Sequence, residues 1–247
     1  MRATGVAALR AYHRHSVSGE LTNPPGPVLF VANHGVGGIF DLNLVAAMAA
    51  FEAMHLDRPV AILTHQLAWS LQVGPLIEPF GAIRASREEA VAAFERGEHV
   101  LVLPGGDVDA FKDYWHRNDI VFGGRTGFAK IAVDAGVPII PVVTAGAGET
   151  ALVLSDGQTL ARALRLDRLV RLKALPISVS VPWGLSVGLA GLLPYFPLPA
   201  RLATEVLPPM RAAEQEDVTL FATQVESAMQ SCLTELASRL RARPSAP

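Results

Sequence analysis

The chain has 247 residues, of which half are hydrophobic and 18% are charged, whereas about a quarter is usual for soluble domains. Its length fits one domain with a substantial core, and the low charge indicates apolar surface buried in that core, in a membrane or against a partner. The net charge of −2 does not favour nucleic-acid binding, and the single cysteine, Cys232, excludes an intrachain disulfide and a cysteine metal cluster.

Apolar runs alternate with stretches of helical spacing along the chain, separated by turns rich in glycine and proline. In chain order, the predicted elements are an amphipathic helix over 1–20, a strand over 28–32, a helix over 41–54, strands over 59–64 and 82–84, a helix over 86–97, a strand over 99–103, a helix over 127–135, a strand over 137–143 and helices over 158–175 and 214–241. This alternation predicts a single α/β domain over 1–247, with a mainly parallel central sheet flanked by helices.

Two apolar stretches interrupt this alternation. Residues 66–79 are predicted to form a broken helix at a surface, because Gly74 and Pro75 lie inside this apolar stretch. Residues 174–200 carry no charged side chain and are long enough to cross a bilayer, but their prolines argue against a regular helix. Since lipid does not tolerate unpaired backbone, we expect residues 174–210 to form apolar or interfacial surface, not a spanning helix.

The helix predicted over 158–175 carries arginine at every third position, namely Arg162, Arg165, Arg168 and Arg171. This spacing produces one slowly winding stripe along the helix. The stripe is either a solvated face or a contact for anionic lipid headgroups, and the sequence favours neither.

In a mainly parallel sheet, sites form at the carboxyl ends of the strands, where two loops contain residues suited to chemistry. The first loop follows Ala32 and contains His34 and Asp41. A histidine after a buried strand can project into a pocket, and a nearby carboxylate can orient its ring, so that His34 deprotonates an alcohol. The same residues also fit an ordinary strand-to-helix loop, in which Asp41 caps the helix and His34 has no role.

The second loop follows Leu103 and contains Gly105 and Gly106. Backbone N–H groups at these glycines can bind an oxyanion or a phosphate, although an ordinary turn explains the same residues. The glycine spacing matches neither a phosphate-binding P-loop nor a dinucleotide fingerprint. The Gly-x-Ser-x-Gly elbow of serine hydrolases is absent from the sequence, and no spacing indicates a zinc site.

Four basic residues lie near predicted strand ends or helix starts: Arg84, Arg87, Arg125 and Lys130. Arginine suits bidentate contact with a phosphate group. Taken singly, each of the four is more often a solvated surface charge.

Four blocks of sequence occur in order between residues 27 and 145. They are Val31 to His34 with Asp41, Gly81 to Glu88, Val102 to Gly106, and Gly124 to Ala132 continuing to Val142. Together they resemble the lysophospholipid and glycerolipid acyltransferase superfamily, and most closely in pattern its diacylglycerol acyltransferase-like branch. The resemblance implies a glycerol-phosphate acyltransferase-like fold and a catalytic dyad of His34 and Asp41. It also implies that substrate binds at Arg84, Arg87, Gly105, Gly106, Arg125 and Lys130.

The chain departs from the family pattern at two places. Six residues separate His34 from Asp41, where the family has four, so Gly37 and Gly38 would have to form a bulge to keep the dyad together. The branch also has arginine and glutamate shortly after Pro-Gly-Gly, where this chain has Val108 and Asp109. The missing arginine argues against a phosphorylated acceptor.

The resemblance implies an O-acyltransferase that moves a fatty acyl group from acyl-CoA or acyl carrier protein to a hydroxyl of a glycerolipid or lysophospholipid. His34 would act as general base, with no metal or redox cofactor. The implied partners are the lipid acceptor, the thioester donor and a membrane surface, and not nucleic acid. The expected location is the cytoplasmic face of a membrane, as a peripheral or monotopic protein. A non-catalytic lipid-binding protein on the same fold and an ester or thioester hydrolase are the alternatives.

Overall fold

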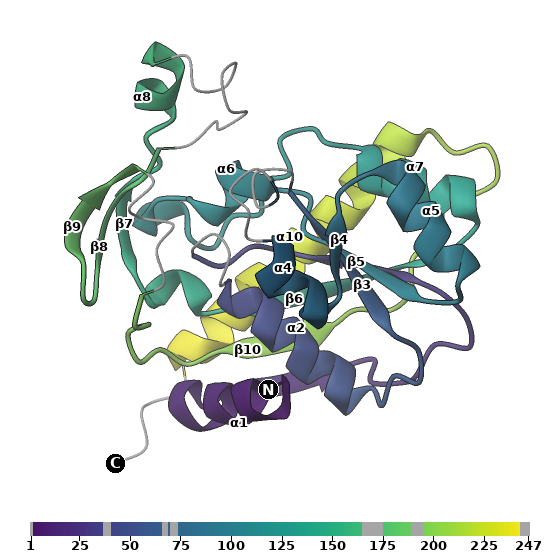
Figure 1. Cartoon of the computed structure of the whole chain (residues 1–247), viewed down its shortest axis with the longest axis horizontal. Coiled ribbons are helices and arrows are strands. Elements are labelled where there is room, and N and C mark those ends of the chain that lie inside the picture. The colour runs from purple at the N-terminus through teal and green to yellow at the C-terminus, as the bar shows by residue number, and fades with distance from the viewer. Residues whose placement is uncertain are drawn as a thin grey trace.

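The computed structural model describes residues 2–36, 41–65, 69, 74–164, 175–188 and 195–242. A seven-stranded sheet runs through the centre of the molecule in the order β1-β10-β6-β2-β5-β3-β4 (Figure 1). Its strands are β1 (Ser16–Gly19), β2 (Leu29–Ala32), β3 (Val60–Thr64), β4 (Ala82–Arg84), β5 (His99–Val102), β6 (Ile139–Ala145) and β10 (Ala203–Val206). The five strands from β2 to β6 pair in parallel, and only β10 pairs antiparallel, with β6. The predicted mainly parallel α/β fold is confirmed.

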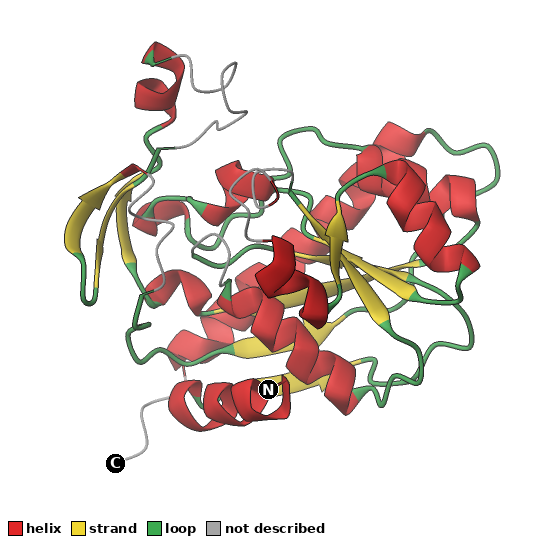
Figure 2. Ribbon diagram, in the orientation of Figure 1, coloured by secondary structure: helices red, strands yellow, loops and turns green. Residues whose placement is uncertain are grey.

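Helices cover both faces of this sheet (Figure 2). The described helices are α1 (Arg2–His13), α2 (Leu42–Ala53), α4 (Gly74–Ile77), α5 (Arg87–Glu95), α6 (Gly106–Ala110), α7 (Gly127–Ala135), α8 (Gln158–Ala163) and α10 (Val218–Ala242), with short 3₁₀ turns at Glu78–Phe80, Tyr114–His116 and Ala147–Glu149. Helix α2 packs on one face and is itself covered by α1, while α5, α7 and α10 pack on the other.

Strand β2 shows why the sheet is buried on both sides. Successive side chains of a strand point to opposite faces. Leu29 and Val31 pack among residues of α5, α7 and α10, whereas Phe30 and Ala32 pack against α2. All four residues are buried, which matches the continuous apolar run in the sequence.

A second, three-stranded antiparallel sheet stands apart from the main one, at the left in Figure 1. It consists of β7 (Leu152–Ser155), β8 (Ile177–Ser180) and β9 (Gly184–Val187). Most of it falls within residues 174–210, where the sequence predicted apolar or interfacial surface. In the part of the chain that the structure describes, no helix combines the length and apolar character needed to cross a membrane.

Several predicted boundaries differ from the structure. The helix expected over 1–20 ends at His13, because Ser16–Gly19 pair with β10 as strand β1. The helix expected from residue 158 is described only as far as Ala163. Arg165, Arg168 and Arg171 of the arginine stripe, and most of the first half of residues 66–79, lie outside the described residues.

Candidate active site

His34 and Asp41 meet at the carboxyl end of β2, next to the ends of its neighbours β5 and β6. His34 Nδ1 lies 2.7 Å from Asp41 Oδ2. A carboxylate oxygen only accepts hydrogen bonds, so Nδ1 carries the proton and the basic lone pair of the imidazole is on Nε2. The Asp41 side chain is 4% exposed and that of His34 is 16% exposed, so the ring forms the accessible end of a buried pair.

Asp41 also fixes the backbone around the dyad. It is the N-cap of α2, where its Oδ1 accepts a hydrogen bond from Asn43 N at 2.8 Å. Both carboxylate oxygens lie 3.1 Å from Gly35 N. The same carboxylate therefore caps α2 and contacts the His34 ring.

Gly35 explains how the dyad closes across six intervening residues. A Cβ at this position would lie 2.8 Å from Ala147 Cβ, 2.9 Å from Asp41 Oδ1 and 3.0 Å from Asn43 Oδ1. Such distances are too short for a side chain, so only glycine allows the backbone to turn directly against the carboxylate. Gly37 and Gly38, which we expected to form a bulge that keeps His34 and Asp41 together, lie outside the described residues.

A second buried carboxylate, Asp109 of α6, holds the backbone of His34. Asp109 Oδ2 accepts a hydrogen bond from His34 N at 2.9 Å. Its Oδ1 accepts from Lys112 Nζ at 2.7 Å and from Val121 N at 3.0 Å. The side chains of Asp109 and Lys112 are 0% and 6% exposed, so they form a buried ion pair. The sequence treated Asp109 only as a departure from a family glutamate, and its link to His34 joins residues 75 positions apart.

Polar side chains tie the same loop to β6 and α2. Asn33 accepts from Thr144 N through Oδ1 and donates to Thr144 O through Nδ2, at 2.9 and 3.0 Å. Asn43 Nδ2 donates to Asn33 O at 3.0 Å. All three residues are buried. Because these hydrogen bonds join the loop to β6 and α2, they position Asn33, the residue that precedes His34.

Tyr195 binds the loop from the side of the small sheet. Its hydroxyl donates to Val36 O at 3.1 Å and lies 3.1 Å from Thr150 Oγ1. Burial raises the Tyr195 pKa to about 12, with a smaller contribution from the charge of Asp41, so the hydroxyl keeps its proton near neutral pH. No sequence signal identified Tyr195, because the contact spans 159 positions and involves a backbone carbonyl.

Arg125 braces the Gly105–Gly106 loop. Its Nη1 donates to Pro104 O at 2.9 Å and to Gly105 O, and its Nη2 lies 3.7 Å from Asp107 Oδ1. In a trans peptide the N–H points opposite to the carbonyl. The N–H groups of Gly105 and Gly106 therefore point away from Arg125. A Cβ on Gly105 would lie 2.1 Å from Asp109 Cβ, so this glycine is needed for close approach.

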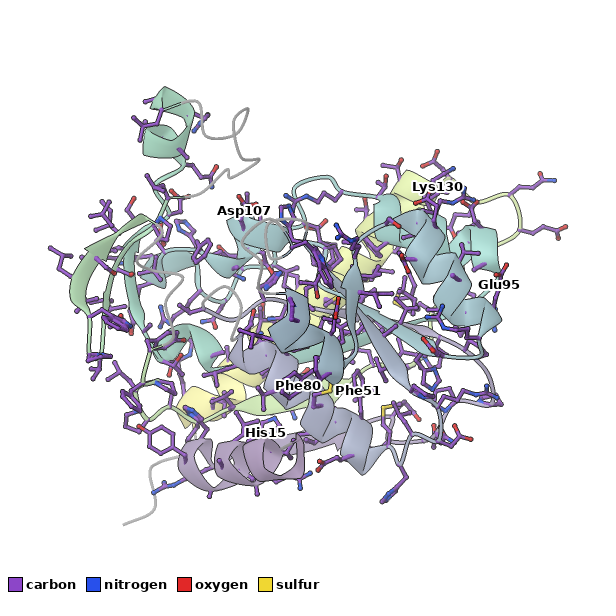
Figure 3. The ribbon with its side chains drawn as sticks, viewed as in Figure 1. His15, Phe51, Phe80, Glu95, Asp107 and Lys130 are labelled. Carbon is purple, nitrogen blue, oxygen red and sulfur yellow. The ribbon has the colours of Figure 1, made fainter. Side chains whose placement is uncertain are left out.

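Arg84, Arg87 and Lys130 are not brought to the dyad. Arg84 ends β4, three strands from β2, which corresponds to about 14 Å at the usual strand spacing, and its guanidinium lies over the Trp69 ring. Arg87 forms an ion pair with Asp134 at 2.7 Å. Lys130 is exposed on α7, and Figure 3 shows it apart from Asp107 on α6.

The cysteine thiol and the described acidic and histidine side chains are further candidates for reactive groups or metal ligands. Burial raises the pKa of the Cys232 thiol to about 12, so it is protonated near neutral pH and is a poor nucleophile. Within the described ranges, no group of three or more histidine, cysteine or acidic residues is placed to hold a metal ion. The described arrangement therefore places His34 beside two buried carboxylates, Asp41 and Asp109.

Comparison with known proteins identifies the family. The family model described as Acyltransferase matches residues 14–145, just over half of the chain. The chain belongs to the acyltransferase family. This region contains His34, Asp41, the Gly105–Gly106 loop and the four predicted basic residues Arg84, Arg87, Arg125 and Lys130. The family predicted from the four sequence blocks is confirmed.

Similar proteins cover parts of the chain. A chicken protein named "DGAT1/2-independent enzyme synthesizing storage lipids" is 30% identical over 55% of this chain and 40% of its own length. The human protein of the same name is also 30% identical, over 54% of this chain and 40% of its own length. An uncharacterized Mycobacterium tuberculosis protein is 29% identical over 78% of this chain and 51% of its own length. The chain thus spans about two fifths to one half of these relatives.

A solved structure shares the fold. The crystal structure of the 1-acyl-sn-glycerophosphate (LPA) acyltransferase PlsC from Thermotoga maritima matches with a TM-score of 0.55. The match covers 98% of this chain and 82% of the other, at 16% sequence identity. At this identity the match shows a common architecture for the sheet and its helices.

Proposed function

We propose that the protein is an O-acyltransferase that moves a fatty acyl group from a thioester, acyl-CoA or acyl carrier protein, to a hydroxyl of a glycerolipid or lysophospholipid. The observation that carries this proposal is the contact of 2.7 Å between His34 Nδ1 and Asp41 Oδ2 in a chain of the acyltransferase family. The names of two similar proteins, which refer to storage lipids and to 1-acyl-sn-glycerophosphate, favour a lipid acceptor.

His34 acts as the general base in this mechanism. Its Nε2 takes the proton from the acceptor hydroxyl while the oxygen attacks the carbonyl carbon of the thioester. Asp41 holds the ring in the tautomer that leaves Nε2 basic and stabilises the imidazolium that forms. Asp109 accepts from His34 N, and Asn33, the preceding residue, is fixed to β6, so both restrain the backbone that carries the ring.

Collapse of the tetrahedral intermediate breaks the carbon–sulfur bond. The imidazolium returns its proton to the departing thiolate, so the products are the lipid ester and the free thiol. The negative charge on the carbonyl oxygen needs hydrogen-bond donors during this step. We assign that role to the backbone N–H groups of Gly105 and Gly106, which point away from the brace formed by Arg125.

The basic residues have separate roles in this proposal. Arg125 positions the Gly105–Gly106 loop through two carbonyl groups. Arg84 lies about 14 Å from β2 along the sheet edge. Like Arg87 and Lys130, it can reach only the distant phosphates of an extended donor or a lipid headgroup. Loss of any of these three is therefore expected to raise KM more than it lowers kcat.

The test is release of free CoA from long-chain acyl-CoA in detergent micelles, measured against a panel of lipid alcohols. We expect release to require one class of acceptor and to fall by about 10³-fold or more in His34→Ala and in Asp41→Asn. Asp41→Asn keeps the size of the side chain and loses the carboxylate that fixes the His34 tautomer. If Asp41→Asn remained fully active, the proposed dyad would be wrong.

The same assay separates the two alternatives. A hydrolase releases free fatty acid without any acceptor. If the protein only binds lipid without catalysis, neither the parent nor His34→Ala releases CoA, and the two bind lipid equally well. The extended His34–Asp41 spacing was the feature that favoured the non-catalytic alternative, and the closed contact between the two side chains removes that argument.

A further inference from the structure

The three-stranded sheet β7-β8-β9 has apolar side chains outside and polar side chains inside. Leu152, Val179 and Leu185 pair across the three strands, and their exposed fractions are 36%, 38% and 68%. The adjacent paired row, Val153, Ser178 and Ser186, is buried, with the two serine hydroxyls 3.1 Å apart. In a water-soluble sheet the polar row is expected to face outward, so this order calls for an apolar medium outside.

The exposed side of this sheet continues beyond the paired row. Leu154, Val181 and Val187 are 39%, 49% and 54% exposed, and Trp183 at the β8–β9 turn is 47% exposed. The three strands and residues 175–188 contain no charged residue. Edge strands in water usually carry charges that prevent association, and monomers rarely expose apolar patches of this extent, so the face is expected to be covered.

The inner side of the sheet adjoins the dyad loop. Val153 and Ser178 line a small cavity together with Val36, Phe111 and Tyr195. Val36 lies two residues after His34, and its carbonyl accepts the hydrogen bond from Tyr195. One layer of sheet therefore separates the outward apolar face from the loop that carries the candidate base.

We propose that the outward face of β7-β8-β9 rests on a lipid bilayer, with Trp183 at the level of the headgroups. A bilayer requires no matching polar groups, whereas a specific protein partner usually finds some, and this face offers no charge to one. Tryptophan at the β8–β9 turn suits the membrane interface. A bilayer on this face would bring the acceptor lipid close to the loop that carries His34. That step rests on the proposed function, whereas the membrane contact itself does not.

The first experiment measures co-sedimentation of the full chain with vesicles of phosphatidylcholine, with and without phosphatidylglycerol. The protein carries His34→Ala throughout, so that binding is measured without turnover. We expect the triple change Val179→Thr, Leu185→Gln and Val187→Thr to weaken partitioning by about tenfold or more. These changes remove apolar surface without adding charge, and circular dichroism checks that the variant is folded.

The matched control is Leu220→Gln, which alters a leucine of 54% exposure at the start of α10, in a different part of the fold. It is expected to bind vesicles as the His34→Ala protein does. Equal losses in the control and the triple variant would overturn the proposal, because binding would then depend on general apolar surface.

A second measurement locates the contact. In a protein whose other two tryptophans are changed, Trp69→Phe and Trp115→Phe, the fluorescence of Trp183 is expected to be quenched by brominated lipid. Vesicle binding without this quenching would overturn the proposal and place the contact elsewhere.

Absence of vesicle binding, together with a dimer that the triple change converts to monomer in sedimentation equilibrium, would instead assign the face to a second copy of the chain. Absence of CoA release by the parent protein, which retains His34, with vesicle binding intact in the His34→Ala protein, would overturn the proposed function alone.

Discussion

The two sheets of this protein treat apolar side chains in opposite ways. Each face of the main sheet is covered by helices, and its polar groups gather at the carboxyl ends of β2, β5 and β6, where they hold His34. The small sheet buries serines and exposes leucine and valine. The main sheet therefore builds and fixes a site, while the small sheet presents a surface, and Tyr195 connects the two through Val36.

The largest effect is expected at the buried ion pair that supports the site. Asp109→Asn leaves the ammonium of Lys112 buried without its carboxylate, which typically costs about 3–5 kcal/mol of stability. It also removes the carboxylate that accepts from His34 N, so kcat is expected to fall with stability. Urea denaturation and CoA release measure the two effects.

The control for this pair is the double variant Asp109→Asn with Lys112→Met, which removes the unpaired charge. It is expected to recover much of the stability and little of the kcat, because the contact with His34 N stays altered. Recovery of both would show that Asp109 serves the fold only. A comparable loss of stability from Ser178→Ala in the small sheet would remove the contrast between the two sheets.

The next effect concerns the closure of the dyad. Gly35→Ala introduces a Cβ that would lie within 2.9 Å of Asp41 Oδ1, so the loop must move away from the carboxylate. We expect kcat to fall by about 10²-fold, since small displacements of a catalytic group have effects of this size. Gly5→Ala in α1, where a Cβ meets nothing within 4 Å, is the matched control and should leave kcat unchanged. Equal kcat values for the two variants would contradict the role of Gly35.

The strands and the candidate site show which features the sequence predicts and which it does not. Strands β2 to β6 and helices α5 and α7 follow from local pattern and were predicted, and in the structure Ser86 caps α5 and Gly136 ends α7. Strands β1, β7, β8, β9 and β10 were missed. Polar residues or glycine interrupt the apolar run in β1, β8, β9 and β10, so no local pattern indicates a buried strand there. Likewise, His34 and Asp41 were found from one loop. Asp109 and Tyr195 act on backbone atoms 75 and 159 positions away, which leaves no motif.

A direct comparison of the sheets uses the same substitution in both. Val100 in β5 is 0% exposed, and Val100→Thr places a hydroxyl in the apolar core at a cost of about 1–3 kcal/mol. Val179 in β8 is 38% exposed, and Val179→Thr is expected to change stability by less than about 0.5 kcal/mol. Both values come from urea denaturation without lipid. A large loss at Val179 would mean that the outer face is packed within the protein, which would also contradict the membrane proposal.

The smallest effect is a pH dependence located in the main sheet. Burial, with a smaller contribution from the charge of Arg58, lowers the pKa of His99 from 6.5 to about 4. Between these values the unfolded chain binds a proton that the folded chain does not, so the stability from this group is complete above pH 6.5 and is lost as the pH falls toward 4. From pH 7 to pH 5 the loss is on the order of 1–2 kcal/mol.

His99→Gln should flatten this acid dependence of the free energy of unfolding, measured in urea at pH 7 and pH 5. His116 provides a control of opposite sign, because its hydrogen bond with Asp113 raises its pKa and stabilises the folded state in acid. His116→Gln should therefore make the acid loss steeper. If His99→Gln left the dependence unchanged, the acid sensitivity would arise elsewhere, and His15, whose pKa burial also lowers to about 4, is the next residue to substitute because it lies beside β10 of the same sheet.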